Sequence, residues 1–156
     1  MGQGTVDYSK GLIYKVCCKD ASITDIYIGS TTNMIKRRNR HKYSCNTLSD
    51  NGYHYKIYRF IRENGGWDNW TMVLVEYVNA TSKQELQKEE RVIIELLKPT
   101  LNSEVPTRTN NEYYIDNKDK WLKQVKCELC DCLLNKSSLK RHQKRNICKK
   151  FQIVED

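Results

Sequence analysis

Two short segments near the start of the chain, LIYKVCC (residues 12–18) and IYIGS (residues 26–30), constrain the fold more than any other part of the sequence. Both are rich in β-branched and aromatic residues, which are typical of β-strands. The residues between them, KDASITD, are polar and typical of a turn. The two segments therefore predict an antiparallel hairpin.

Two helices are expected after the hairpin. The first begins near Thr32 or Asn33, because either side chain can cap a helix, and runs to about Cys45. The second lies within YHYKIYRFIREN (residues 53–64), where apolar residues recur at helical spacing, and it stops at a pair of glycines.

A strand and a last helix complete this part of the chain. WTMVLVEYV (residues 70–78) is apolar enough to be a central strand of a sheet. The helix that follows opens with a capping box of Ser82 and Glu85 and ends before Pro99. The order ββααβα predicts a small α/β (α+β) domain over residues 1–102.

Composition and charge limit the partners and the compartment. The formal net charge of +8 indicates a polyanionic partner or a phosphate-bearing surface. The chain has no apolar run of about 18 residues that would predict a transmembrane helix, and its first residues, MGQGTVDYSK, lack the apolar segment of a secretory signal peptide. We therefore expect an intracellular protein, in the cytoplasm or nucleus, with no membrane partner. Its seven cysteines are then expected to be thiols or metal ligands rather than disulfides.

Positive charge is concentrated directly after the second predicted strand, where it could hold an anionic substrate. Arg37 and His41 are four residues apart and therefore share one face of the predicted helix. The Arg37 guanidinium could bind a phosphate there, with the phenols of Tyr14 and Tyr27 nearby for proton transfer. Each tyrosine taken alone is more typical of strand packing. The whole cluster consists of Lys36, Arg37, Arg38, Arg40, His41 and Lys42.

Glu90 lies where the last predicted helix should present an apolar side chain. Leu86, Ile93 and Leu97 form an apolar stripe, and Glu90 is the position between them on that face. A carboxylate at a core-facing position is costly unless it is paired, so Glu90 is a candidate functional residue. Two alternatives stay open. Either the stripe is slightly rotated, so that Glu90 reaches solvent or a basic partner, or the neighbouring Glu89 has the functional role.

The segment from residue 12 to residue 102 resembles the GIY-YIG nuclease domain. The two tripeptides that give the family its name correspond to LIY (residues 12–14) and YIG (residues 27–29). The chain departs from the family pattern at Leu12, because the family usually has glycine there. Gly11 is the adjacent residue, and Tyr14 keeps its place.

The later part of the segment also resembles the family. An arginine at Arg37 and a histidine at His41 have the family's spacing from YIG. EERVIIELLKPTLN (residues 89–102) reproduces the end of the family's core, in which a metal-binding glutamate is followed by a proline and then an asparagine. Counting back from these two residues selects Glu90 over Glu89.

This resemblance implies a fold and an activity. The fold would be a three-stranded antiparallel sheet flanked by helices, with an active site over the sheet that cleaves phosphodiester bonds with one divalent metal, Mg²⁺ or Mn²⁺. Glu90 would be the metal ligand, and Arg37 would neutralise the scissile phosphate. Tyr14 would be the preferred general base, with Tyr27 and His41 orienting it or relaying its proton. Which of the two tyrosines is the base stays open.

Other residues would support the site or contact DNA. The resemblance implies a supporting role for Gly29 and Asn102. The remaining basic residues of the cluster are expected to contact the DNA backbone or to be solvated: Lys36, Arg38, Arg40 and Lys42.

The last thirty residues contain four of the cysteines and predict a second module over residues 121–150, after a polar linker over residues 103–120. Their spacing, C-x₂-C-x₁₁-H-x₅-C, is close to that of a ββα zinc finger. The predicted zinc ligands are Cys127, Cys130, His142 and Cys148.

The predicted finger has a hairpin and a helix. The hairpin would present the first two cysteines, and a helix from about Ser137, capped by Asn135, would present His142. Leu133 or Leu134, with Leu139, would fill its small core. Cys132 is an alternative zinc ligand, although the two-residue gap favours Cys130. The residues expected to contact DNA are Lys140, Arg141, Lys144 and Arg145.

These features predict a divalent-metal-dependent DNA endonuclease that is targeted by a DNA-binding zinc finger. A nuclease core followed by a small finger resembles endonucleases of the homing or mobile-element type, often encoded by phages or large DNA viruses. One alternative is a structure-specific repair or resolving nuclease. Another is a catalytically idle DNA-binding protein of the same fold. The sequence leaves the target, the cleavage pattern and the oligomeric state open.

Overall fold

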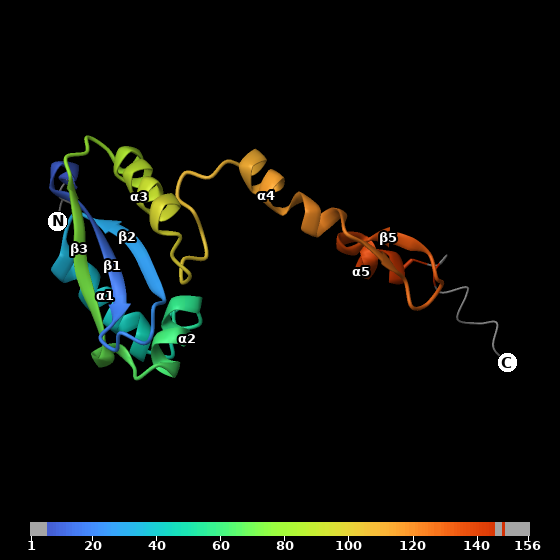
Figure 1. The fold of residues 1–156 in the computed structure, drawn as a ribbon, viewed down its shortest axis with the longest axis horizontal. Helices are drawn as coiled ribbons and strands as arrows, with labels where there is room; N and C mark the ends of the chain where they lie inside the picture. The colour runs from blue at the N-terminus through green and yellow to red at the C-terminus, as the bar shows by residue number, and fades with distance from the viewer. Residues whose placement is uncertain (1–5, 146–147, 149–156) are drawn as a thin grey trace. The chain divides into compact units, whose positions relative to one another are not determined.

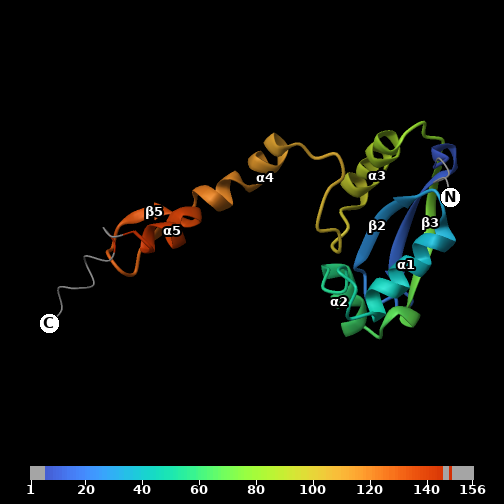
Figure 2. The same cartoon turned by 180° about the vertical axis from the view of Figure 1, so that it is seen from behind.

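The computed structural model of the chain describes residues 6–145 and Cys148 (Figures 1 and 2). It consists of two compact units, divided between Thr107 and Arg108. Part of the sequence predictions falls outside the described residues: residues 1–5 of the predicted first domain, and residues 146, 147, 149 and 150 of the predicted finger. The predicted domain boundaries remain predictions.

The first unit is built on a three-stranded antiparallel sheet, as the sequence predicts. After a short 3-10 turn, η1 (Tyr8–Lys10), the hairpin of β1 (Gly11–Cys18) and β2 (Ile26–Thr31) forms, and β3 (Trp70–Val78) pairs with the other edge of β1. The strand order is therefore β2-β1-β3.

The expectation that residues 70–78 form a central strand is wrong. β1 is central, and β3 lies at the edge of the sheet (Figure 1). Most of the side chains of β3 are exposed, including the apolar Val73, Leu74 and Val75. Apolar composition does not distinguish the two positions, because it does not record which strand edges are already paired.

Helices cover both faces of the sheet. One core lies between the Tyr14 face of the sheet and the helices α1 (Met34–Asn46) and α2 (Lys56–Glu63), together with the short turn η2 (Trp67–Asn69). The other core lies between the opposite face and α3 (Lys83–Leu97). α1 passes behind the sheet in Figure 1 and in front of it in Figure 2. No helix among the described residues combines the length and apolar character that crossing a membrane requires.

The ends of α1 and α3 follow local signals in the sequence. The side chain of Asn33 accepts a hydrogen bond from the Lys36 amide and so caps α1. Ser82 caps α3 by accepting from the Glu85 amide, but the capping box is only half formed. The Glu85 carboxylate accepts from the amide of Thr81, at 2.7 Å, rather than from that of Ser82.

The buried face of α3 is rotated from the predicted stripe. Its buried residues are Leu86, Glu90 and Ile94, whereas Leu97 is exposed. Glu90 therefore lies at the centre of the buried face, with 9% of its surface exposed, rather than reaching into solvent.

The segment after α3 closes the free edge of β2. The Leu101 amide donates to the Ile26 carbonyl at 3.1 Å. The Asn102 side chain accepts from the Ile28 amide and donates to the Ile28 carbonyl, both at 2.9 Å. Asn102 thus replaces the backbone partner that an additional strand would supply, and it fixes β2 next to α3.

The second unit begins with α4 (Asn110–Leu122), which occupies most of the predicted linker over residues 103–120 and extends two residues beyond it. Thr109 and Glu112 form a capping box at its start, in which each residue bonds to the amide of the other. None of the residues of α4 is buried. An exposed helix has no apolar period to detect, so its capping box was the only local signal.

A small ββα unit follows α4. It contains β4 (Gln124–Lys126), β5 (Leu133–Asn135), the 3-10 turn η3 (Lys136–Ser138) and α5 (Leu139–Gln143). The helix thus begins as a tighter turn than predicted, and Asn135 makes no side-chain capping hydrogen bond. Of the two leucines considered for its core, Leu133 is exposed and Leu134 is half-buried.

Replacing Asn102 with Asp should destabilise the first unit. A carboxylate keeps the bond from the Ile28 amide but puts an acceptor against the Ile28 carbonyl. We expect the free energy of unfolding to fall by about 1–3 kcal/mol. Denaturant unfolding measures this change, with Asn39→Asp on the exposed surface of α1 as the matched control. Equal losses in the two variants would contradict the role assigned to Asn102.

Candidate active site and metal cluster

A cleft of about 690 Å³ in the first unit brings together residues that are far apart in the sequence. It lies along the β2 edge, between α1 and α2 on one side and α3 with its following segment on the other. Of the residues predicted for the site, its walls include Tyr27, Arg37, Arg40, Glu90 and Asn102.

Tyr14 lies behind the wall of this cleft and is fully buried. Its hydroxyl accepts a hydrogen bond from Nε of Arg37 at 2.6 Å and lies 2.9 Å from Nε2 of His41. Burial raises the pKa of Tyr14, and the nearby Tyr27 raises it further, whereas Arg37 opposes this shift. The charge and the hydrogen bond of Arg37 are what favour the ionised form of Tyr14.

Gly29 provides the space that the Tyr14 ring occupies. The two residues are direct partners in the β1–β2 ladder. A Cβ at position 29 would lie 2.5 Å from the Tyr14 hydroxyl and 2.8 Å from its Cζ atom. These distances are shorter than any non-bonded carbon contact, so only glycine lets Tyr14 lie across β2.

His41 lies at the centre of a group of rings. It is 1% exposed, stacks on Trp67 with ring centroids 5.8 Å apart, and its Nδ1 lies 2.9 Å from the hydroxyl of Tyr58. Burial, together with the charge of Arg37, lowers the pKa of His41 to about 3. The imidazole is therefore neutral at neutral pH and has one donor and one acceptor nitrogen.

Of the two predicted tyrosines, Tyr27 is the one that lines the cleft. Its ring centroid lies 6.4 Å from that of Tyr14 and 5.7 Å from that of His41. Burial raises the pKa of Tyr27, and the charge of Arg37 opposes the shift. The predicted group of Tyr14, Tyr27, Arg37 and His41 is thus assembled in one place.

Glu90 lines the cleft from α3, on the side opposite α1 and α2. Its Oε2 accepts a hydrogen bond from the Ser30 hydroxyl at 2.6 Å. Burial raises the pKa of Glu90, whereas the bond from Ser30 and the charge of Arg37 lower it. Its neighbour Glu89 is exposed and does not line the cleft. A buried carboxylate that lines a cleft is a suitable oxygen ligand for Mg²⁺ or Mn²⁺, so the donor type at this position fits such a metal.

β1 is continuous through Leu12, although its pairing with β3 shifts register between Ile13 and Tyr14. Leu12 pairs with Thr31 in the same register that places Tyr14 opposite Gly29. Its side chain is buried in the same core as Tyr14. Gly11 begins the strand, where a Cβ would lie 2.7 Å from the Val78 carbonyl oxygen.

The basic residues of α1 separate into three groups. Arg40 lines the cleft and forms an ion pair with Asp50 at 2.9 Å. Arg38 and Lys42 line a second hollow, of about 460 Å³, together with Lys19. Lys36 is exposed and lines neither hollow.

Three residues of the site were not found from the sequence: Ser30, Tyr58 and Trp67. Ser30 directly follows the YIG tripeptide, so its position next to a known motif was a signal that could have identified it. Tyr58 and Trp67 reach His41 through the packing of α2 and η2, and no spacing in the sequence predicts that contact.

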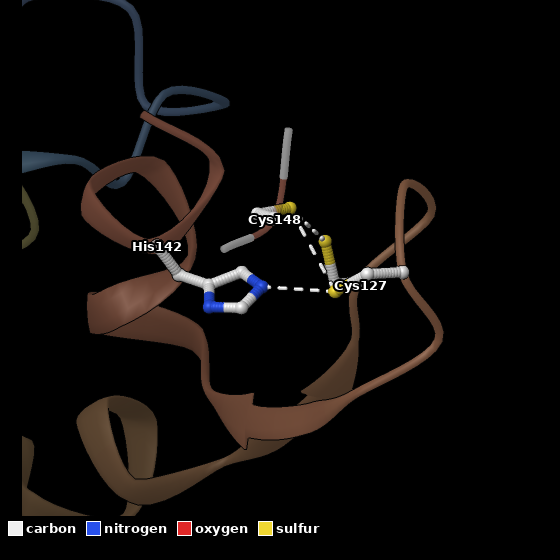
Figure 3. A group of neighbouring side chains, drawn as sticks. Cys127, His142 and Cys148 are labelled. Carbon is white, nitrogen blue, oxygen red and sulfur yellow. Dashed lines mark hydrogen bonds between the residues drawn. The ribbon is translucent and has the colours of Figure 1, made fainter. Parts of the chain in front are cut away.

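In the second unit, the four predicted zinc ligands converge as expected. Figure 3 labels three of them, Cys127, His142 and Cys148. The ligand atoms of Cys127, Cys130, His142 and Cys148 all lie within 4.8 Å of one another. The sulfur of Cys148 is 3.7 Å from that of Cys127 and 3.7 Å from that of Cys130. A tetrahedral zinc with Zn–S bonds of about 2.3 Å requires sulfur atoms about 3.8 Å apart, so the cluster fits zinc.

Cys132, the alternative zinc ligand, is exposed and is not part of the group of four. Backbone bonding to Cys132 and the contact with His142 lower the pKa of Cys130 to about 6, whereas burial raises the pKa of Cys148 to about 12. The four basic residues predicted to contact DNA are all exposed: Lys140, Arg141, Lys144 and Arg145.

Comparison with protein-family models matches residues 10–103 to the family described as GIY-YIG catalytic domain. The match covers more than half of the chain and contains all the residues predicted for the nuclease site, from Tyr14 to Asn102. Comparisons with curated proteins and with solved structures gave no match.

His41 should make the stability of the first unit depend on pH. Its pKa is about 3 when folded and about 6.5 when unfolded. Between these values the unfolded chain binds a proton that the folded chain does not, so the free energy of unfolding falls as the pH falls. We expect a loss of roughly 2 kcal/mol from about pH 6.5 to about pH 4.5, because one pKa unit corresponds to about 1.4 kcal/mol.

Denaturant unfolding of a Trp121→Phe chain measures this effect, because its two remaining tryptophans, Trp67 and Trp70, belong to the first unit. The loss should persist in His54→Gln, since His54 is exposed, and should disappear in His41→Gln. An unchanged pH dependence in His41→Gln would show that another group titrates.

Proposed function

Because the chain belongs to the GIY-YIG family, a superfamily of nucleases, we propose that it is a divalent-metal-dependent DNA endonuclease that hydrolyses phosphodiester bonds. The observation that carries this proposal is the placement of Glu90 and Arg37 on the walls of one cleft. A carboxylate for a metal and a guanidinium for a phosphate then face the same space. Tyr27 lines that space, and Tyr14 is bonded directly to Arg37.

Glu90 would hold the metal, with Ser30 orienting its carboxylate through Oε2. When bound, Mg²⁺ or Mn²⁺ would supply Lewis-acid stabilisation of the scissile phosphate and its leaving oxygen. Arg37 would bind the non-bridging oxygens of that phosphate. Its guanidinium is already held by Tyr14, so little reorganisation is required when negative charge develops.

Tyr14 remains the preferred general base, because it has two groups that favour loss of its proton. The Arg37 guanidinium at 2.6 Å stabilises a phenolate, and the neutral His41 imidazole at 2.9 Å is positioned to accept the phenol proton. Tyr27 faces the cleft and is assigned the contact with the nucleophilic water. Both phenols then lie on the path by which a proton leaves the water.

The zinc-bound second unit would add affinity and target bias. A single finger contacts about 3 base pairs, which is too few for a unique site. Its basic residues and those of α1 would contact the DNA backbone, and the tether would raise the effective concentration of the nuclease on the same duplex. A nuclease with such a small appended DNA-binding unit favours a homing or mobile-element role over a structure-specific repair or resolving role.

Glu90→Gln should abolish nicking of supercoiled plasmid in Mg²⁺ while leaving DNA binding intact. The substitution keeps the size of the side chain but removes the charge that holds the metal. We expect the rate to fall by at least about 100-fold.

Glu89→Gln is the matched control, because this neighbour is exposed on the same helix. It should cut at the rate of the unsubstituted chain. Loss of nicking only in Glu89→Gln would reassign the metal ligand. Failure of the unsubstituted chain to cut plasmid or branched DNA would favour the catalytically idle DNA-binding protein instead.

The second unit should bind a single zinc ion that stabilises it, because so small a unit buries too little apolar surface to fold alone. Metal analysis of purified protein measures the zinc content. Cys130→Ser should lose the zinc, whereas Cys132→Ser should keep it, since Cys132 lies outside the cluster. Retention of zinc in Cys130→Ser together with loss in Cys132→Ser would mean that Cys132 is the ligand.

A further inference from the structure

We propose that Tyr58 is a positioning residue that fixes the tautomer of His41, with the proton on Nδ1 and the lone pair of Nε2 directed at the Tyr14 hydroxyl. No motif identifies Tyr58, and it belongs to α2 rather than to the strands and helices that carry the predicted site. The catalytic consequence rests on the proposed nuclease function, whereas the tautomer itself does not.

Each ring nitrogen of His41 has a tyrosine hydroxyl as its hydrogen-bond partner. Nδ1 lies 2.9 Å from the Tyr58 hydroxyl and Nε2 lies 2.9 Å from the Tyr14 hydroxyl. A neutral imidazole has one N–H, so only one of these two bonds can have His41 as its donor. Tyr14 is fully buried, His41 is 1% exposed, and Tyr58 is 7% exposed where it lines the cleft.

Arg37 determines the direction of these bonds. A guanidinium has donors only, so Arg37 donates to the Tyr14 oxygen at 2.6 Å. The Tyr14 proton is then donated to Nε2 of His41, which is the other hydrogen-bond partner of this hydroxyl. Nδ1 is consequently the protonated nitrogen of His41, and the Tyr58 oxygen accepts its hydrogen bond.

This arrangement gives Tyr58 a function in catalysis. A phenol acts as a base only after it has lost its own proton, and Nε2 of His41 is the acceptor that Tyr14 contacts. With the other tautomer, His41 would donate to the Tyr14 oxygen, and Nε2 could not accept the Tyr14 proton. Tyr58, through His41, therefore makes Tyr14 available as a base.

Nitrogen-15 NMR of the histidine-labelled full-length chain tests the proposal. The chain has three histidines, so the His41 signals are readily assigned with a His54→Gln variant and the zinc-ligand behaviour of His142. At pH 7, His41 should give a protonated Nδ1 and an unprotonated Nε2. In Tyr58→Phe the Nδ1–H has no acceptor, and this pattern should be lost or reversed.

Cleavage kinetics provide the second readout. Tyr58→Phe should lower kcat by on the order of 10- to 100-fold with KM unchanged, which is the scale of losing an orienting partner. Tyr77→Phe is the matched control, because it removes a hydroxyl from an exposed residue of β3 outside the cleft. It should change neither the spectrum nor kcat. Thermal unfolding checks that both variants are folded.

Two results would overturn the proposal. One is an Nε2–H tautomer or an imidazolium for His41 at pH 7 in the unsubstituted chain. The other is a folded Tyr58→Phe chain with unchanged His41 signals and unchanged kcat. If the predicted tautomer is observed but the unsubstituted chain cuts no DNA, the positioning role of Tyr58 stands and the proposed nuclease function fails.

Discussion

The rest of the site depends on the hydrogen bonds of one buried hydroxyl, that of Tyr14. Through this group β1 is joined to two successive turns of α1, at Arg37 and at His41. The bonds are formed in a core without bulk water, where an unmet polar group would cost about 1–3 kcal/mol. The position of α1 on the sheet is thus coupled to the position of the phosphate-binding guanidinium.

Two other features follow from this arrangement. Gly29 is required because the Tyr14 ring crosses β2 at that residue. The carboxylate of Glu90 arrives from the opposite face of the sheet and is oriented by Ser30, one residue further along β2. β2 therefore carries both halves of the site on adjacent residues, and Asn102 holds its outer edge in place.

Much of the first unit could be predicted from the sequence, because its signals are local. The hairpin, the Asn33 cap and the stop before Pro99 each depend on a few neighbouring residues. Glu90 was identified by a carboxylate in an apolar stripe, even though the stripe itself is rotated to Leu86 and Ile94.

Long-range geometry could not be predicted in the same way. The edge position of β3 depends on which strand edges are already paired, and the contact of Tyr58 with His41 depends on how α2 packs on α1. Neither leaves a period or spacing in the sequence. The helical nature of α4 was missed for another reason, since an exposed helix carries no apolar stripe.

The most direct test of the account is a single-turnover cleavage in ¹⁸O-labelled water with enzyme in excess over a short DNA duplex. If the two tyrosines act as base and water contact, the new phosphate terminus should carry one ¹⁸O atom and no DNA should become attached to the protein. DNA covalently linked to Tyr14 or Tyr27 would contradict this account, because a phenol would then be the nucleophile. A cut without ¹⁸O in the product would also contradict it.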